Sequence, residues 1–215
     1  MQQNLILMQE IKETTAYKKQ LKGRILEAAL KAFAEHGVKA VRMDDVAQML
    51  AISKRTLYEI FGDKEELLYQ VVTHFDQEEK QSMEAFISKA PSVMDIIIEA
   101  YQRKVARTGS VNPLFYDDVQ RYPKVMQYIN NRNERAYVQF VGFLQRGVGE
   151  GYFRSNVDYE LVAQMFNAIN RYIMNQHLLK HYTKQQLFNN MILVPLRGFC
   201  TKKGLEVLDK SFKTL

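Results

Sequence analysis

Residues Arg42 to Leu67 read RMDDVAQMLAISKRTLYEIFGDKEEL, and this stretch organises the rest of the chain. Val46, Ala47 and Leu50 fall on one face of a first short helix. Two aspartates precede them in the first turn, where the helix dipole favours negative charge. The pattern is then interrupted, which predicts a tight turn.

A second short helix is predicted from Lys54 to Phe61. Ser53 is suited to cap it because a serine hydroxyl accepts hydrogen bonds from free backbone N–H groups, and Gly62 is suited to end it. Asp63 then caps a third helix, with a glutamate three residues later in capping-box register. Two short helices joined by a short turn form a helix-turn-helix unit, here at about residues 42–61.

The outward face of the second helix carries side chains that can bind DNA. They are two cations, a hydroxyl and a phenol: Lys54, Arg55, Thr56 and Tyr58. Such groups bind phosphates and base edges when a helix lies in a major groove. The alternative is an ordinary helical hairpin with a solvated basic face.

The segment resembles the DNA-binding domain of the TetR/AcrR family of bacterial transcriptional regulators. The matching residues are ILEAALKAFAEHG at 25–37, DDVA at 44–47, ISKRTLY at 52–58 and FGDKEEL at 61–67. The match covers about the first third of the chain. Two positions depart from the family pattern: Ala51 stands where glycine is frequent, and Arg42 stands where a Thr or Ser cap is frequent.

The residues expected to contact DNA are Arg42, Ser53, Lys54, Arg55, Thr56, Tyr58 and Lys64. Among these, Arg55 is suited to a bidentate contact with guanine. Lys64 lies beside a helix N-terminus and can form a phosphate clamp with its free N–H groups. Cations at the start of the preceding helix can also reach the DNA backbone: Lys18, Lys19, Lys22 and Arg24.

Composition indicates an all-α protein. The 215 residues include only four prolines and ten glycines, and no segment alternates as a strand does. The net charge is +6, but residues 1–68 hold eleven cations and ten anions, so the basic excess does not lie in the predicted DNA-binding part. One cysteine and no long apolar run or signal pattern predict a cytoplasmic protein without a membrane span.

About nine helices and two domains are predicted. A DNA-binding domain spans 18–67 and a ligand-sensing and dimerisation domain spans 68–215. The expected helices cover 18–36, the two of the helix-turn-helix, 63–88, 92–107, a short one to 121, 124–150, 158–181 and 183–203, with a tail at 205–212. Breakers separate them at 90–92 and 108–113. The helix from Lys64 to Ser88 belongs to both domains and is the expected lever between them.

The resemblance implies a homodimer formed by the last two long helices, at about 159–182 and 184–200. Both carry more apolar residues than one face needs, although a broad core would explain this too. Pro195 lies inside the second of them and should kink it or remove one hydrogen bond.

The resemblance also implies a small-molecule inducer, bound among the middle helices. Aromatic and methionine side chains with a few polar tips suit a small, largely apolar ligand. The candidate lining residues are Phe86, Tyr101, Phe115, Tyr116, Tyr122, Met126, Tyr137, Phe140, Met165, Phe166 and Asn170. Aromatic residues at helical spacing are also typical of an ordinary core.

We expect no enzyme, no catalytic residue, no cofactor and no metal. The sequence has no P-loop, dinucleotide fingerprint, HExxH or Gx-Ser-xG motif. His177 and His181 have a spacing that can hold a metal, but no further ligand lies near them in sequence, and Cys200 is expected to be an unreactive buried thiol. The main alternative is a ligand-independent DNA-binding regulator whose C-terminal domain only dimerises or binds a protein partner.

Overall fold

The structure is a computed structural model that describes residues 2–89, 91–108 and 111–212, without the side chains of 2–15 and 104–108. The helices are α1 Gln2–His36, α2 Met43–Met49, α3 Lys54–Phe61, α4 Lys64–Ile87, α5 Val93–Thr108, α6 Leu114–Val119, α7 Pro123–Gly149, α8 Tyr159–Asn175, η1 Leu178–Lys180, α9 Lys184–Leu187, η2 Phe188–Leu193, α10 Val194–Phe199 and α11 Lys202–Phe212. The all-α prediction is confirmed. Within the described ranges, extended pairing is limited to one bridge between Phe153 and Cys200.

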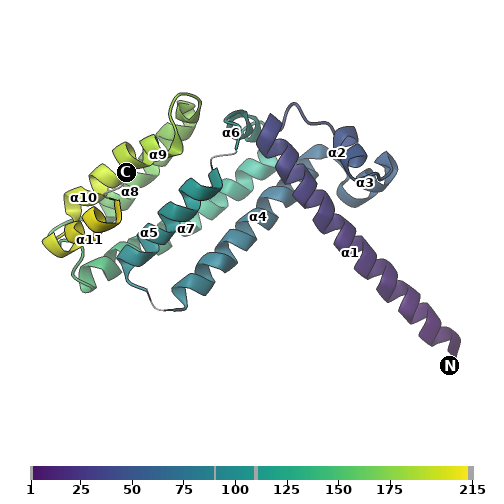
Figure 1. Cartoon of the computed structure of the whole chain (residues 1–215), viewed down its shortest axis with the longest axis horizontal. Helices are drawn as coiled ribbons and strands as arrows, with labels where there is room; N and C mark the ends of the chain where they lie inside the picture. Colours follow the sequence, from purple (N-terminus) through teal and green to yellow (C-terminus); the bar gives the residue numbers. More distant parts are fainter. Residues whose placement is uncertain (1, 90, 109–110, 213–215) are drawn as a thin grey trace.

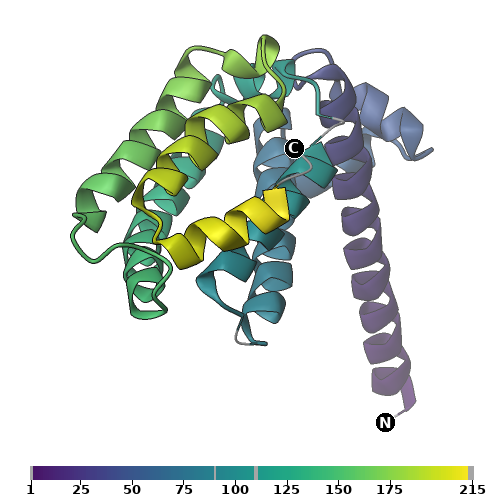
Figure 2. The same cartoon turned by 60° about the vertical axis from the view of Figure 1, so that its left-hand side comes forward.

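Helix α1 begins earlier than predicted. It runs from Gln2 to His36, and its N-terminal half projects away from the other helices in both views (Figures 1 and 2). The predicted start at Lys18 was therefore wrong. The sequence between Gln2 and Lys22 contains neither proline nor glycine, so nothing in it interrupts the helical hydrogen bonds.

Two apolar cores divide the molecule. The first contains the buried faces of α1, α2, α3 and the start of α4, and it also takes in Val119 and Val125 from α6 and α7. The second lies among α5, α7, α8, α10 and α11. The last buried residue that helix α4 contributes to the first core is Val71, and α4 also runs beside α7 (Figure 1), whereas none of its residues belongs to the second core.

The helices after residue 158 are shorter than predicted. Asp158 caps α8 as expected, since its carboxylate accepts from the N–H groups of Glu160 and Leu161 at 3.0 and 3.1 Å. However, α8 ends at Asn175, because His177 adopts a left-handed conformation with φ of 51°. The prediction that this helix extends to 181 or 182 was wrong. His177 and His181 therefore do not lie on one face of a helix.

The last predicted long helix runs without a gap from Lys184 to Phe199, but its hydrogen-bonding pattern changes twice along its length. Thr183 caps α9, the segment Phe188–Leu193 has π-type hydrogen bonding, and α10 follows with Pro195 in its first turn. Pro195 has no N–H to donate, and a helix commonly widens or bends next to such a residue. The interruption predicted at Pro195 is thus present, but it takes the form of a π segment. The chain then turns at Cys200 before α11, so the predicted continuation to 203 was wrong.

Several predicted boundaries agree with the structure. The Ser92 hydroxyl accepts from the N–H of Asp95 at 3.2 Å at the start of α5. Of the predicted breakers, Ala90, Gly109 and Ser110 lie outside the described residues. No helix in the described part of the chain has both the length and the apolar character needed to cross a membrane.

Candidate DNA-binding surface

Helices α2 and α3 form a compact pair whose inner faces are fully buried. Val46 and Ala47 of α2 and Leu57 and Phe61 of α3 are all less than 5% exposed, within the first core. Burial of these four side chains fixes α3 against α1 and α4, so that its opposite face is left in solvent. The predicted helix-turn-helix at 42–61 therefore has the expected shape.

The turn between the two helices uses a left-handed alanine. Ala51 has φ of 52°, a region in which a Cβ atom is unfavourable. The turn is held by the N–H of Ile52, which donates to the carbonyl of Ala47 at 3.0 Å. Alanine thus stands where glycine is frequent in the family, and the turn keeps its left-handed conformation with some backbone strain.

Ser53 and Thr56 form the cap of α3. The Ser53 hydroxyl accepts from the backbone N–H of Thr56 at 3.0 Å, and the two hydroxyl oxygens lie 2.8 Å apart. Ser53 is thereby committed to positioning the first turn of α3. Ser53 is exposed and Thr56 is half-buried, so the Ser53 hydroxyl is the more accessible of the two to a phosphate.

The two cations of α3 are each paired with a carboxylate. Lys54 Nζ lies 2.9 Å from Asp44, and Arg55 Nε donates to Glu59 at 2.8 Å. The hydrogen bond from Asp44 raises the pKa of Lys54, and that from Glu59 raises the pKa of Arg55. Both cations are well exposed, with Arg55 at 89%, so these pairs orient the side chains without burying them.

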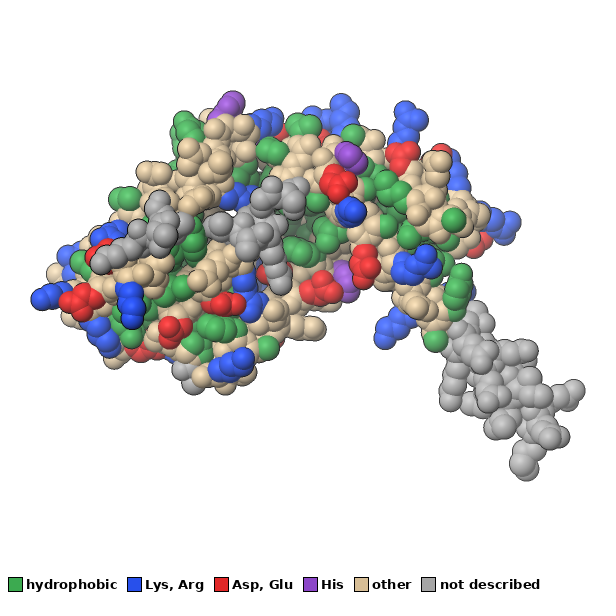
Figure 3. All heavy atoms as spheres, in the orientation of Figure 1, with side chains coloured by type: hydrophobic (Ala, Val, Ile, Leu, Met, Phe, Trp, Pro, Cys, Tyr) green, Lys and Arg blue, Asp and Glu red, His purple; other side chains and the backbone are tan. Residues whose placement is uncertain are grey.

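Tyr58 and Arg42 flank these cations. Tyr58 is 40% exposed, and Lys54 Nζ lies 5.8 Å from its ring centroid. Arg42 is exposed before α2, and its backbone N–H donates to Asp45 at 2.7 Å. Asp45 thus supplies the reciprocal half of a capping box at the start of α2. Figure 3 shows Lys and Arg side chains interleaved with acidic ones at this end of the molecule.

Lys64 has a different environment from the other predicted contacts. It is half-buried, and its Nζ lies 3.5 Å from the carbonyl of Lys39. Burial lowers the pKa of Lys64, and the nearby Asp118 and Asp45 partly offset that effect. Asp63 caps α4 through the N–H of Glu66 at 2.7 Å, whereas the Glu66 side chain bonds Gln70 and Lys124. The Glu66 side chain is therefore engaged elsewhere than at the Asp63 backbone N–H, so the predicted capping box at the start of α4 is only half formed.

The cations of α1 extend this surface. Lys18, Lys19 and Arg24 are exposed. Lys22 is half-buried, with its Nζ 6.0 Å from the ring centroid of Phe61 at the end of α3. Lys22 therefore lies beside the end of α3, and Lys18, Lys19 and Arg24 lie on the same helix as Lys22, which is α1.

Helix α6 makes contacts that the sequence did not predict. Asp118 is 7% exposed and accepts from the N–H of Lys39 at 2.7 Å, in the turn between α1 and α2. Gly37 makes the close approach possible: it has φ of 81°, and a Cβ there would lie 3.1 Å from Asp118. Asn112 adds a bond from its N–H to the carbonyl of Ala34 at 2.7 Å. Asp118 and Lys39 are 79 residues apart, so no local pattern could have revealed this junction.

The neighbouring aspartate of α6 faces the other way. Asp117 pairs with His177 and Lys180 around η1. Burial alone would raise the pKa of Asp117, but hydrogen bonds from Lys180 and His177 lower it below its ordinary value of 3.8. Tyr116 also accepts from Lys184 Nζ at 2.7 Å. Helix α6 therefore joins the helix-turn-helix on one side to the C-terminal helices on the other.

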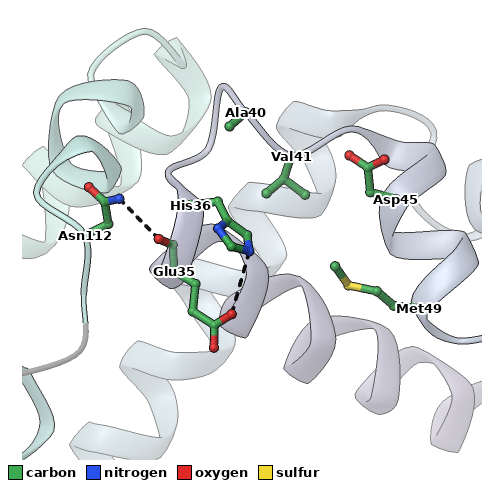
Figure 4. A pocket seen from close by; sticks show the side chains of 7 residues that line it. All are labelled: Glu35, His36, Ala40, Val41, Asp45, Met49 and Asn112. Atoms are coloured by element: carbon green, nitrogen blue, oxygen red, sulfur yellow. Dashed lines mark hydrogen bonds and ion pairs between the residues drawn. The ribbon is translucent and has the colours of Figure 1, made fainter.

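An open pocket lies next to this junction. It has a volume of about 480 Å³ and is lined by Glu35, His36, Ala40, Val41, Asp45, Met49 and Asn112. Figure 4 shows the Asn112 amide donating to the Glu35 carbonyl oxygen and His36 pairing with the Glu35 carboxylate. These residues come from α1, the loop between α1 and α2, α2 itself and the segment before α6, outside the predicted ligand-binding region. A much smaller pocket lies between α6 and η1.

The predicted ligand-lining residues fall into two separate groups. Phe115, Tyr122 and Met126 pack against the first core. Tyr101 and Phe166 belong to the second core, with Tyr137 and Phe140 packed on it. Phe86 and Tyr116 are half-buried, whereas Asn170 and Met165 are exposed on α8. The structure does not bring this set around one space.

Comparisons with known proteins agree with this geometry. Residues 25–71 match the family of bacterial regulatory proteins, tetR family. The transcriptional repressor KstR2 of Mycobacterium tuberculosis is 26% identical over 147 residues, which cover 66% of this chain and 73% of KstR2. The solved KstR2 structure, described as a ketosteroid transcriptional regulator, covers 84% of this chain and 95% of its own at 23% identity, with a TM-score of 0.57.

A second solved structure is more similar in fold. The transcriptional regulator from Saccharomonospora viridis, in complex with choline, covers 86% of this chain and 100% of its own with a TM-score of 0.70. Its 18% identity shows a common fold alone. The matched segment includes the whole of α2, the turn, α3 and the first turns of α4, which are the elements of the surface described above. Residues 25–71 are therefore similar to the DNA-binding segment of the tetR family of bacterial regulatory proteins, and the relatives that match more of the chain are transcriptional repressors, which indicates a DNA-binding transcriptional regulator rather than an enzyme.

Proposed function

We propose that this regulator is a repressor that binds a palindromic operator as a homodimer and is released by a small, largely apolar ligand. The observation that supports it best is the exposed face of α3, which carries Lys54, Arg55 and Tyr58, with the half-buried Thr56 beside them, while Leu57 and Phe61 are buried. A helix with this arrangement fits a major groove, and its N-terminal residues meet base edges there.

The proposed DNA contacts divide by chemistry. Arg55 reads a guanine, because its fork of N–H groups matches the O6 and N7 acceptors once Glu59 is displaced. Lys54, Tyr58 and Arg42 bind phosphates, and the hydroxyls of Ser53 and Thr56 add neutral contacts. The burial of Lys64 favours a supporting role, in which it reaches a phosphate at the edge of the surface from the α4 N-terminus.

The proposed dimer uses the exposed apolar face of α8. Leu161, Met165 and Tyr172 are 61%, 39% and 54% exposed. Spacings of four and eleven residues place all three on one side of the helix. Val194 of α10 is 60% exposed as well. Large apolar side chains on one exposed helix face are typical of a protein interface, and a two-fold pair would place two α3 helices about 34 Å apart for successive major grooves.

The proposed domains are a DNA-binding domain at 18–67 and a ligand-sensing and dimerisation domain at 68–215, and the second domain contributes Leu68, Val71, Val119 and Val125 to the first core. Helix α6 adds a contact between them beside α4. A ligand that favours a different position of α6 must weaken DNA binding by the difference in its affinities for the two conformations. Both Asp118 and Asp117 belong to α6. Asp118 bonds the turn before α2 and Asp117 pairs with His177 beside η1, so α6 is the proposed element through which such a difference is transmitted.

A ligand-independent regulator is the second candidate. The observation in its favour is that the predicted lining residues are divided between two cores rather than placed around one pocket. In its favour too, the 480 Å³ pocket lies beside the helix-turn-helix. Against it stands the solved relative that holds choline, a small molecule, in the same overall fold.

One experiment addresses the DNA half of the proposal. Selection of bound sequences from a random DNA pool should return a palindrome whose half-sites are one helical turn apart, bound by two copies of the chain. Sedimentation of the complex gives the stoichiometry. Recovery of a single half-site bound by one copy would contradict the dimer. With the operator known, a small-molecule screen for operator release distinguishes the two candidates.

A further inference from the structure

Tyr101 of α5 carries a buried hydroxyl without a partner. The residue is 6% exposed, and its hydroxyl oxygen has no hydrogen-bond partner among the described residues. Buried hydroxyls in folded proteins nearly always have a partner, so an exception needs an explanation. Asn189, which follows Phe188 in the chain, has a buried side-chain oxygen in the same condition.

Aromatic rings from three elements enclose Tyr101. The ring centroid of Phe188 lies 4.3 Å away and that of Phe212 lies 5.0 Å away, with Phe188 and Phe212 separated by 6.0 Å. Phe188 begins the π segment η2. π segments within helices are frequent at functional sites because they change the direction of a side chain by adding one residue to a turn. We name Tyr101, Phe188 and Phe212 the ring cluster.

Helix α11 closes the ring cluster from outside. Figure 2 shows α11 running from α10 toward α5 across this side of the molecule. Its buried residues Gly204, Leu208 and Phe212 stand four residues apart, on one face. The start of α11 is fixed, because Gly204 donates its N–H to the Thr201 hydroxyl at 3.2 Å and a Cβ on Gly204 would lie 2.4 Å from the carbonyl oxygen of Tyr152.

The far end of α11 is held differently. Phe212 is the last described residue of the helix, and its contacts with the ring cluster are between aromatic rings. Helix ends open at low cost compared with helix centres. Phe212 is therefore the wall of the ring cluster that moves most easily, since Tyr101 and Phe188 lie on more central elements.

We propose that the ring cluster is a closed binding site for a small aromatic or alicyclic molecule that carries one hydroxyl or carbonyl group. Phe212 occupies the place of the apolar body of the ligand and leaves when the ligand enters. The polar group of the ligand then forms the hydrogen bond that Tyr101 lacks. This site would serve the ligand-release half of the proposed function, and it is tested by binding alone.

The test uses two probes that differ by one hydroxyl. Toluene has the shape of the phenylalanine side chain, and p-cresol adds the group that should meet Tyr101. Calorimetry should show that Phe212→Ala binds p-cresol about tenfold more tightly than toluene, and about tenfold more tightly than the wild-type chain does. The double variant Phe212→Ala with Tyr101→Phe should bind both probes equally.

Two further variants make the result specific. Leu205→Ala removes a half-buried side chain of the same helix outside the ring cluster, and it should leave probe binding at the wild-type level. The chain contains no tryptophan, so Phe212→Trp supplies a single indole, which can be excited selectively over the twelve tyrosines. Its emission should shift to the red when p-cresol displaces the indole into water, which can be measured even if Phe212→Ala folds poorly.

Some outcomes would overturn the proposal. They are equal binding of both probes by Phe212→Ala, the same gain in Leu205→Ala, or unchanged emission of the Phe212→Trp variant at saturating p-cresol. Operator affinity is measured separately with and without p-cresol. Binding of p-cresol without operator release would support the ring-cluster site and contradict its role in ligand release. Operator release by another molecule, with no binding of p-cresol, would support the ligand-release function and contradict the ring-cluster site.

Discussion

Ala51 shows how a single residue constrains the recognition unit. Its φ of 52° is required for the tight turn that sets α3 against α2, and the N–H of Ile52 closes the turn onto Ala47. Left-handed alanine is less stable than left-handed glycine because of the Cβ atom. The fold therefore tolerates strain here in exchange for the correct angle between the two helices.

Replacement of Ala51 by glycine should relieve this strain. We expect Ala51→Gly to raise the free energy of unfolding by about 0.5–1 kcal/mol, measured by urea denaturation. Ala40→Gly is the matched control, since Ala40 is also exposed and outside the helices but has no positive φ. It should be neutral or slightly destabilising. A loss of stability in Ala51→Gly would contradict the strain argument.

Arg55 is the residue on which sequence specificity should depend most. It is 89% exposed, and Glu59 holds it by one ion pair that water can replace. Arg55→Ala should reduce operator affinity about 5- to 100-fold and relax the preference at one base step. Fluorescence anisotropy with single-base variants of the operator measures both effects.

Two comparisons separate base contact from general charge. Arg24→Ala, on α1, should weaken binding to all sequences alike, as expected for a phosphate contact. Lys89→Ala, an exposed cation beyond the far end of α4, should have no effect. If Arg55→Ala weakened all sequences equally, Arg55 would be a phosphate contact and our assignment would be wrong.

At the scale of the element, α6 is six residues long yet contacts both parts of the molecule. Adjacent residues of a helix point about 100° apart, so Asp117 and Asp118 reach different neighbours. Asp118 accepts from Lys39 beside α2, and Asp117 pairs with His177 and Lys180 of the η1 segment. The left-handed conformation of His177 brings its ring to Asp117, which explains why α8 ends there.

The pairing of Asp117 should make stability depend on pH. Its pKa in the folded chain lies below the ordinary 3.8, so the carboxylate stabilises the fold above that pH and the contribution is lost as the pH falls through the folded pKa. Asp117→Asn should therefore lower the free energy of unfolding by about 1–2 kcal/mol at pH 7 and by progressively less toward pH 3. Urea denaturation at constant ionic strength measures the difference.

Glu206→Gln is the comparison for this titration. Glu206 is an exposed acid on α11, and its replacement should change stability little at either pH. A constant difference between wild type and Asp117→Asn across the pH range would show that the loss comes from packing rather than from charge.

At the scale of the whole molecule, the exposed apolar face of α8 requires a partner. Leu161→Glu should give a monomer in sedimentation velocity at micromolar concentration, because a carboxylate would be buried against its own copy. Operator affinity should fall with it, since one α3 helix loses the second half-site. Helical circular dichroism should be unchanged, because Leu161 is 61% exposed in the single chain.

Ile87→Glu is the matched control. Ile87 is 39% exposed at the end of α4, on a different helix, and the variant should stay dimeric. If Ile87→Glu dissociated the protein and Leu161→Glu did not, the interface would lie at the end of α4.

The sequence by itself determined the recognition unit, because its signals are local. Ser53, Gly62 and Asp63 act on the backbone within four residues, and the apolar spacing of Val46, Ala47 and Leu57 selects the buried face. The same applies to the cap at Asp158. Helix limits that depend on distant contacts were missed, such as the end of α8, where His177 turns to meet Asp117.

Only the tertiary structure decided how the two parts are joined and where the aromatic residues go. Aromatic side chains on α5, α6, α7 and α8 all looked alike as ligand candidates, because helical spacing shows that a face is apolar but not which neighbour covers it. In the folded chain Phe115 packs against the first core and Tyr101 lies in the second, where the ring of Phe212 on α11 packs against it. Contacts between residues far apart in the chain depend on packing, which no short pattern encodes.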